Sequence, residues 1–245
     1  MFIYIRLLLA HLIGDFPLQL NPVFNLKQKS LLGGIPHALI IVICSLLLMW
    51  PYLNHPATWH FAFFIGSVHL LQDWIKLRCT VPRLSFWTYI ADQLSHAGVL
   101  ALIFFTDLPV FALPTDSGNP LLQLYCNDHV IVYCIALILA TYNGFYMIRN
   151  FKDSFFLKPE QHTAFEKWYG IVERALIVTC FYLAGSTLYL LPAMLLIRPL
   201  LILWPKNPLK LAATFASLTE ISLSWLIGLL CGYILFLFQA GYPIN

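Results

Sequence analysis

Long apolar runs separated by short polar connections are the dominant pattern along this chain. Each run is about 20 residues long, the length that a helix needs to cross the hydrocarbon core of a membrane. The strands of an outer-membrane barrel would instead alternate apolar and polar positions over about 10 residues. The pattern therefore predicts an all-α, polytopic membrane protein, with spans near residues 2–21, 34–53, 58–78, 86–106, 129–150, 169–189, 191–204 and 212–238.

The sixth and seventh of these spans form one continuous run, from Tyr169 to Trp204, which is too long for a single crossing. Proline lacks a backbone N–H group and interrupts helices, so we place a break around residues 190–192, which include a proline. The segment 191–204 is then short, and the sequence leaves open whether it crosses fully. We expect about eight transmembrane helices, with seven as the alternative.

The composition agrees with a membrane protein. Apolar residues make up 60% of the chain and charged residues only 10%, against roughly 25% charged residues in a typical soluble domain. These values exclude a disordered chain and a nucleic-acid-binding module. The 6 cysteines are scattered and form no CxxC pair, so neither a disulfide framework nor a thiolate metal site is expected. The expected partner is the lipid bilayer.

The positions of the basic residues predict the orientation of the chain. Of the 14 Lys and Arg residues, three (Arg6, Arg174 and Arg198) fall well inside expected spans, and the others lie in loops or at span ends. If eight helices alternate in direction, the other eleven lie on one side, namely Lys27, Lys29, Lys76, Arg78, Arg83, Arg149, Lys152, Lys158, Lys167, Lys206 and Lys210. Because basic loops stay in the cytoplasm, we expect both termini outside and a multi-pass protein of the bacterial inner (cytoplasmic) membrane.

The connection between the fourth and fifth spans divides the chain. Residues 107–128 carry three prolines, three acidic residues and no basic residue, a composition typical of an exposed loop. We expect this external loop to separate a four-helix half, residues 1–106, from a second four-helix half, residues 129–245.

The first four expected helices contain an unusual set of ionisable residues. Three of these helices carry a His and an Asp four positions apart, and the second helix opens with a single His. The residues are His11 and Asp15, His37, His69 and Asp73, and Asp92 and His96. Charged groups are costly within a membrane, so such residues normally face the interior of the bundle and find partners there.

The order of the paired residues reverses between antiparallel helices. The first and third expected helices read HxxxD, whereas the fourth reads DxxxH. Residues four positions apart share one face of a helix, and one turn of helix separates them by about 6 Å along its axis. We therefore expect one shared site, with a carboxylate layer towards the cytoplasm and an imidazole layer deeper in the membrane. His37 is expected near the carboxylates.

Neutral imidazoles combined with carboxylates are the ligands of a divalent metal, for which we favour Zn²⁺ over Fe²⁺ or Mn²⁺. Seven candidates exceed the four ligands of one tetrahedral site, so either two metals bind or some residues orient ligands or transfer protons. The candidate ligands are His11, Asp15, His69, Asp73, Asp92 and His96, and the candidate catalytic residues are His37 and Asp92. The alternative is that these groups only hold helices together.

The second half contains a smaller set of intramembrane charges. Glu173 lies one turn into the sixth expected helix, Arg198 lies within the seventh and Glu220 within the eighth. Intramembrane charges normally pair with one another, so we expect Arg198 to pair with Glu220 or with Glu173.

Five separated elements in the first hundred residues resemble an uncharacterised bacterial membrane family with an HLxGDFxxQ signature. They are LLLAHLIGDFPLQL at residues 7–20, the Lys-rich turn after it, His37, HLLQDWIK at residues 69–76 and DQLSH at residues 92–96. The resemblance implies a shared architecture and motif, and it brings no established activity.

Three functions are compatible with these residues. The leading hypothesis is a metal-dependent membrane enzyme, most simply a hydrolase of a lipid or lipid-linked substrate that enters from the cytoplasmic side. The alternative is a transporter of a metal ion or of a proton-coupled solute, in which the same residues bind and release their cargo. The third is a membrane scaffold with an ion-paired core and no catalytic activity.

Overall fold

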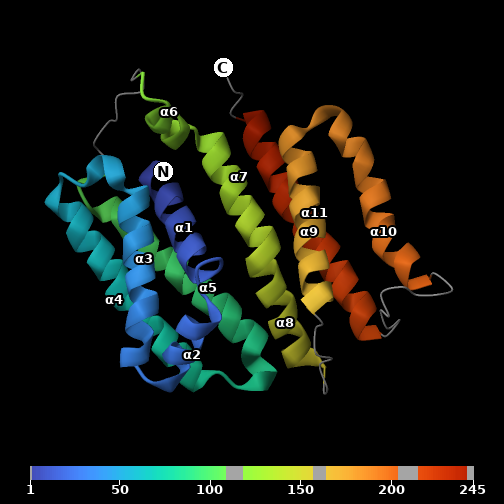
Figure 1. Ribbon diagram of the computed structural model, residues 1–245, viewed down its shortest axis with the longest axis horizontal. Coiled ribbons are helices and arrows are strands. Elements are labelled where there is room, and N and C mark those ends of the chain that lie inside the picture. Colours follow the sequence, from blue (N-terminus) through green and yellow to red (C-terminus); the bar gives the residue numbers. More distant parts are fainter. Residues whose placement is uncertain (1, 109–117, 157–163, 204–214, 242–245) are drawn as a thin grey trace. The chain divides into compact units, whose positions relative to one another are not determined.

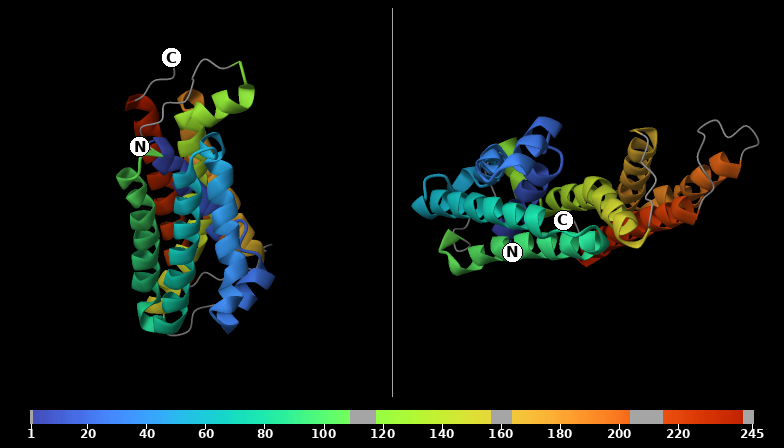
Figure 2. Two further views of the ribbon diagram at one scale, coloured as in Figure 1. Left: turned by 90° about the vertical axis from the view of Figure 1, so that its left-hand side faces the viewer. Right: turned by 90° about the horizontal axis from the view of Figure 1, so that it is seen from below.

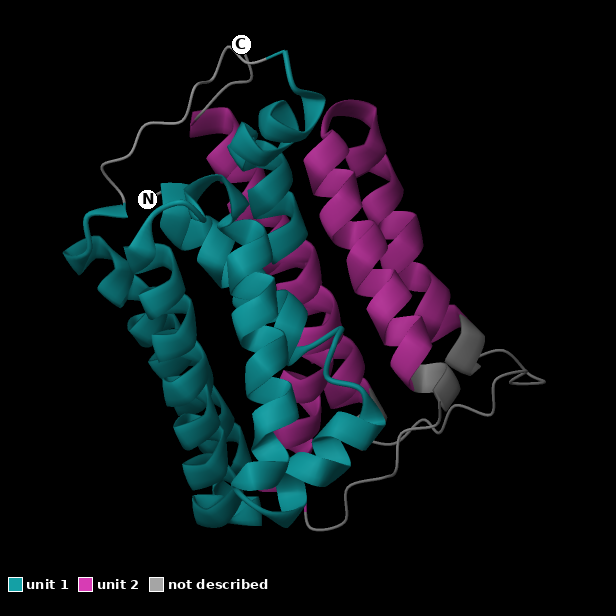
Figure 3. Ribbon diagram, turned by 60° about the vertical axis from the view of Figure 1, so that its left-hand side comes forward, with its two compact units in different colours: residues 1–135 teal, residues 136–245 magenta. Residues whose placement is uncertain are grey.

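The computed structural model describes residues 2–108, 118–156, 164–203 and 215–241. Within these ranges every regular element is a helix and none is a strand (Figure 1). This confirms the all-α class. The chain forms two compact units, residues 1–135 (unit 1) and residues 136–245 (unit 2), which are distinguished by colour in Figure 3.

Several of the helices are suited to a membrane by length and composition. Three helical stretches among the described residues are long and apolar enough to cross one, namely Pro82–Phe105, Asp128–Phe155 and Leu218–Gly241. Two further apolar helical stretches, Leu32–Leu48 and Gly185–Leu200, are shorter. These stretches coincide with five of the eight expected spans.

Unit 1 is built around four helices, α1 (Phe2–Asp15), α3 (Ile35–Leu48), α4 (Pro56–Cys79) and α5 (Ser85–Ala101). Helix α1 packs against α3 and α5, and α4 packs against the same two helices. Figure 2 shows α3, α4 and α5 side by side. The helices therefore enclose a common interior, which receives one face of each.

Two glycines allow the helices of unit 1 to approach closely. A Cβ atom at Gly66 of α4 would overlap the side chain of Val42, and a Cβ at Gly14 of α1 would lie 2.6 Å from Cδ1 of Ile41. Both partners belong to α3. The two glycines lie next to the ionisable residues of their helices, so the close approach brings those residues together.

The interior of unit 1 is divided along its length. An apolar core, which includes Leu7, Ile41, Ile65 and Leu100, fills the part next to the first half of α1. The ionisable residues follow at the other end of α1, where His11 and Asp15 are both buried. The apolar packing thus fixes the helices on which the polar residues stand.

The first expected span, residues 2–21, is wrong in its extent. Helix α1 ends at Asp15, and a separate short helix, α2 (Asn21–Lys29), follows. Prolines explain the change, because Pro17 comes just after α1 and Pro22 stands at the start of α2, positions where proline ends and begins helices. The lysines of the expected first loop therefore lie on a helix.

The expected external loop, residues 107–128, also contains structure. Helix α6 (Pro120–Cys126) begins there, with the side chain of Asn119 accepting a hydrogen bond from the backbone N–H of Leu121. Arg6 of α1, which is fully buried, donates to the carbonyl oxygen of Tyr125 and contacts the Asp128 carboxylate at 2.6 Å. These contacts attach α6 to the bundle of unit 1.

Unit 2 contains helix α8 (Gly144–Phe155), α9 (Ala164–Leu183), α10 (Leu191–Leu203) and α11 (Phe215–Gly241). Helix α7 (Asp128–Ile138) crosses the boundary between the units and continues through a π-helical turn, η6 (Leu139–Asn143), into α8. Helices α9 and α11 pack against each other and against η6.

The long run from Tyr169 to Trp204 is interrupted, although earlier than expected. Helix α9 ends at Leu183, and the chain turns at Ala184 and Gly185, whose φ angles are 50° and 58°. A 3-10 helix, η7 (Gly185–Leu190), leads to α10. Glycine adopts positive φ without strain, so it is Gly185 rather than the later proline that marks the break.

The ion pair expected in the second half is confirmed. Nη2 of Arg198 lies 2.9 Å from Oε1 of Glu220, and Nη1 lies 3.7 Å from Oε2 of Glu173. Lys152 adds a second cation, 2.9 Å from Oε2 of Glu220. Arg174 donates to the carbonyl oxygen atoms of η6, which a π-helical turn leaves available.

Candidate metal centre

The structure brings the four histidines and three aspartates predicted to share a site into one buried cluster in unit 1. None of these side chains belongs to a residue that is more than 8% exposed. Three overlapping groups of potential ligand atoms form within the cluster, each with its atoms no more than 4.8 Å apart. The groups are His11, His69 and His96; Asp15, His37, His69 and Asp73; and Asp73, Asp92 and His96.

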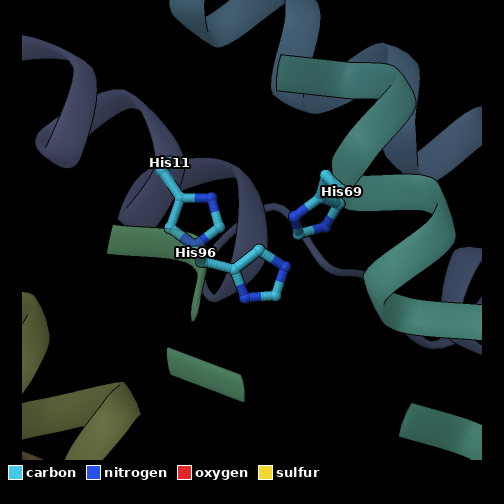
Figure 4. A group of neighbouring side chains, drawn as sticks. All are labelled: His11, His69 and His96. Atoms are coloured by element: carbon cyan, nitrogen blue, oxygen red, sulfur yellow. The ribbon is translucent and has the colours of Figure 1, made fainter. Parts of the chain in front are cut away.

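The first group is an imidazole layer made by three helices. Figure 4 shows the rings of His11, His69 and His96 next to one another, from α1, α4 and α5. The ring centroids are 4.5 Å apart for His69 and His96, 4.8 Å for His11 and His96, and 5.2 Å for His11 and His69. The spacing of HxxxD and DxxxH motifs on antiparallel helices produces this convergence.

Nitrogen atoms in this layer lack hydrogen-bond partners. Nε2 of His11, Nδ1 of His69 and both ring nitrogens of His96 are buried without one. Most buried polar atoms in folded proteins do have a partner, and an exception calls for a specific explanation such as a bound ion or water. Three neighbouring imidazoles with unused nitrogen atoms could hold a divalent metal ion.

The second group is a carboxylate layer with His37 at its centre. Nε2 of His37 lies 3.2 Å from Oδ1 of Asp15 and 3.5 Å from Oδ2 of Asp73. Nε2 of His69 lies 3.1 Å from Oδ2 of Asp73 and 3.0 Å from Nε2 of His37. His37 therefore lies among the carboxylates, where the helix directions predict it.

His69 belongs to both layers. Its ring lies edge-on to that of His11 and tilted against that of His96, and its Nε2 contacts Asp73. Gln19, in the connection after α1, adds a polar contact at the outer side of the layer, because its Nε2 lies 3.1 Å from Nε2 of His37. The two layers therefore form one continuous polar cluster.

Asp92 completes the cluster from α5. Its Oδ1 lies 3.7 Å from Nδ1 of His96, which is too long for a hydrogen bond, and its Oδ2 lies 2.6 Å from Nζ of Lys76. Gln93 also donates to Oδ2. The Asp92 carboxylate is therefore shared between a cation and the edge of the imidazole layer.

Two lysines in the site are absent from the candidate ligands and candidate catalytic residues of the sequence analysis. Nζ of Lys27 lies 2.5 Å from Oδ2 of Asp73, and both side chains are less than a tenth exposed. Lys76 pairs with Asp92. In the sequence, both lysines lie in or next to expected cytoplasmic loops, so the excess of basic residues on the cytoplasmic side already accounts for them. In the structure each lysine pairs with a particular carboxylate.

The sequence contains a signal for one of these lysines. His69, Asp73 and Lys76 stand at positions i, i+4 and i+7, which share one face of a helix. Lys27 has no such signal, because it reaches the site only after the chain turns back between α1 and α2. No rule of local spacing predicts that turn.

The fold and the cluster together define a class: an all-helical protein with membrane-length helices and a buried site of imidazole and carboxylate ligands. Residues 3–116 match the model of a family described as Protein of unknown function (DUF3307). The match confirms the resemblance to an uncharacterised family, and it spans all seven residues of the cluster. No curated protein and no solved structure matches the chain.

Proposed function

We propose that this protein is a metal-dependent enzyme of the membrane, a hydrolase of a lipid or lipid-linked substrate. The observation that carries the proposal is the imidazole layer: three buried rings from three helices, with unpartnered nitrogen atoms facing a common interior. Three or four ligands of this kind bind Zn²⁺, and Fe²⁺ or Mn²⁺ accept the same mixed nitrogen and oxygen set.

The proposed arrangement in the membrane has eight helical segments with both termini outside. Helices α1, α3, α4, α5, α7 with α8, α9, α10 and α11 would then cross, and the carboxylate layer would face the cytoplasm. The distribution of lysine and arginine supports this orientation. In a bacterium the membrane would be the inner one.

Each part of the cluster has a proposed role. His11, His69 and His96 hold the metal, and Asp15 and Asp73 either bind a second ion or orient the imidazoles, as carboxylates commonly do beside metal-bound histidines. His37 contacts two carboxylates and one imidazole, which places it to move a proton within the carboxylate layer. A bound divalent ion would supply an activated water molecule.

Scaffolding alone explains the cluster less well. Residues that only hold helices together would satisfy their hydrogen bonds with one another. Here hydrogen bonds join His37 to Asp15 and to His69, and Lys76 to Asp92. All four histidines nevertheless leave at least one ring nitrogen unpartnered, and His96 leaves both. Unpartnered buried nitrogens destabilise a scaffold but are required in a ligand set.

A transporter is the second candidate, and one observation favours it. His69 belongs to both ligand groups, so an ion bound among the imidazoles could pass to the carboxylates without leaving protein ligands. A transporter would release its metal readily, whereas an enzyme retains it. Retention during dialysis therefore separates the two functions.

Elemental analysis of the detergent-purified protein tests the proposal. We expect close to stoichiometric Zn, Fe or Mn in the wild type after dialysis, and none in a His69→Ala/Asp73→Ala variant. The matched control is His60→Ala, because His60 is an exposed histidine on the same helix, α4. His96→Gln provides a milder second variant, with folding checked by gel filtration and thermal melting.

The outcomes are distinct. Metal that is present in the wild type and in His60→Ala, and lost from folded His96→Gln, supports the enzyme. Metal that is bound but lost in dialysis, together with metal flux in proteoliposomes, supports the transporter. A wild type that stays metal-free after incubation with Zn²⁺, Fe²⁺ and Mn²⁺ would refute the enzyme and the metal transporter, and it would favour proton coupling or a scaffold.

A further inference from the structure

The carboxylate layer carries two ammonium groups that metal binding alone does not explain. Lys27 pairs with Asp73, and Lys76 pairs with Asp92. The two carboxylates are neighbours, since ligand atoms of Asp73 and Asp92 lie within 4.8 Å of each other. Two cations therefore lie side by side at the layer that is proposed to face the cytoplasm.

Helix α2 contributes one side chain to the cluster, that of Lys27, which pairs with Asp73. Helix α2 has 9 residues, all described, and Lys27 is its one buried side chain. An isolated helix of this length is marginally stable in water, and a lysine side chain costs rotamer entropy to hold in place. The main interior contact of α2 is thus an ammonium group delivered to the site.

The net charge of the cluster would change sign if a metal bound. Three carboxylates (Asp15, Asp73 and Asp92) and two ammonium groups leave one net negative charge when the imidazoles are neutral. One divalent cation converts this to one positive charge, and a second to three. A net charge buried in a medium of low dielectric constant is costly unless a counter-charge accompanies it.

Metal binding would also weaken the ion pairs of the two lysines. A carboxylate that binds a divalent cation has less negative charge to offer an ammonium group, so the ion pairs of Lys27 and Lys76 weaken. Each ammonium group then has donors available next to the metal. Lysine is a common partner of phosphate in proteins because it places a compact positive charge with three donors.

We propose that the metal-loaded site binds a phosphate group, held by Lys27 and Lys76, and that the substrate is a phosphate ester of a lipid. This inference rests on the proposed metal-dependent hydrolase and names its substrate class. A neutral ester would leave the positive charge of the loaded site without a partner. A phosphate brings one or two negative charges and enough oxygen atoms to accept from both lysines.

The reaction then balances with water as the only co-reactant. A water oxygen forms a bond to phosphorus, and the ester bond between phosphorus and the alcohol oxygen breaks. The electron pair of that bond stays on the alcohol oxygen, which receives one proton from the water. The products are inorganic phosphate and a lipid alcohol.

The test measures phosphate binding by titration calorimetry on the full chain in detergent. The probes are inorganic phosphate and dihexanoyl phosphatidic acid, each added to metal-loaded and metal-free protein. Metal content is determined in the same samples. The variants are Lys27→Gln and Lys76→Gln, and the matched control is Lys29→Gln, because Lys29 is an exposed lysine on the same helix as Lys27.

We expect both probes to bind the metal-loaded wild type at least ~10-fold more tightly than the metal-free protein. Each lysine variant should weaken binding by about 10-fold, as for a lost charge-assisted hydrogen bond, with metal content unchanged. Lys29→Gln should behave as wild type. Lys76 is 28% exposed at its side chain, so its variant folds more readily if Lys27→Gln does not.

Equal phosphate affinity with and without metal, or unchanged affinity in both lysine variants, overturns the inference while leaving the metalloenzyme intact. Binding of inorganic phosphate without phosphatidic acid overturns the lipid assignment. If the wild type binds no metal, the proposed metal-dependent function itself is refuted.

Discussion

Breaking the ion pair between Lys27 and Asp73 is expected to destabilise unit 1 strongly, and removing both partners is expected to restore most of the loss. The perturbations are Lys27→Met, Asp73→Asn and the double variant. In the wild type the two groups lie 2.5 Å apart with side chains that are 7% and 5% exposed. At an effective dielectric constant of about 20, the attraction at this distance is about 7 kcal/mol.

Desolvation of both groups offsets most of that attraction, so the net effect of the pair is much smaller. Removing one partner is different, because it leaves the other charge buried. The usual cost is about 3 to 5 kcal/mol. Lys27→Met leaves the Asp73 carboxylate near Asp15 and Asp92 with only imidazole partners, and Asp73→Asn leaves the ammonium group of Lys27 without its carboxylate. The double variant strands neither.

The assay is the free energy of unfolding in detergent, from denaturant titrations followed by circular dichroism at a fixed metal-free condition. We expect each single variant to lose about 3 kcal/mol or more and the double variant to lose at least 2 kcal/mol less than the sum of the singles. A coupling below about 0.5 kcal/mol would show that the pair is solvated and that α2 does not close over the site.

Three further predictions follow from other contacts. Gly66→Leu is expected to cost about 1 to 3 kcal/mol by pushing on Val42, whereas Gly98→Ala, which meets nothing within 4 Å, should be neutral or stabilising in thermal melts. Glu220→Gln removes the carboxylate that pairs with Lys152 and leaves Arg198 only its longer contact with Glu173; it should lower the melting temperature without changing the metal content of folded protein. Chelator should lower the melting temperature of the wild type but not that of His96→Gln, because a metal at 100 times its Kd contributes about 2.7 kcal/mol to the free energy of unfolding.

Each of these has a result that contradicts it. A Gly98→Ala variant as unstable as Gly66→Leu would show that helix flexibility rather than close packing matters. Metal loss in folded Glu220→Gln would tie the charges of unit 2 to the site of unit 1. If chelator does not change the melting temperature of the wild type, no bound metal stabilises the folded protein.

The arrangement of the histidines and aspartates could be predicted from the sequence because it depends on local rules. Residues four apart share a helix face, and antiparallel neighbours reverse the order of a motif. Those two rules are enough to place His11, His69 and His96 in one layer and His37 with the carboxylates. The pairing of Arg198 followed from the cost of isolated charges.

The parts that failed depend on turns and on contacts between distant segments. The first twenty residues are apolar almost throughout, so their hydropathy does not show that α1 ends at Asp15. The signal for that end is the pair of prolines, one on either side of the turn. Arg6 reaches Asp128 across more than a hundred residues. The positive φ at Ala184 likewise has no signature in composition.

The two lysines explain how such a site folds before it binds anything. Three carboxylates gathered in a helical interior would repel one another and oppose packing, and in small metal-binding domains folding waits for the metal to neutralise them. Here Lys27 and Lys76 already reduce the charge to a single negative unit. The metal-free protein should therefore keep its helical content and its gel-filtration volume. If a metal binds the carboxylates and weakens these ion pairs, both ammonium groups would stay next to it, where the proposed anionic substrate could bind them.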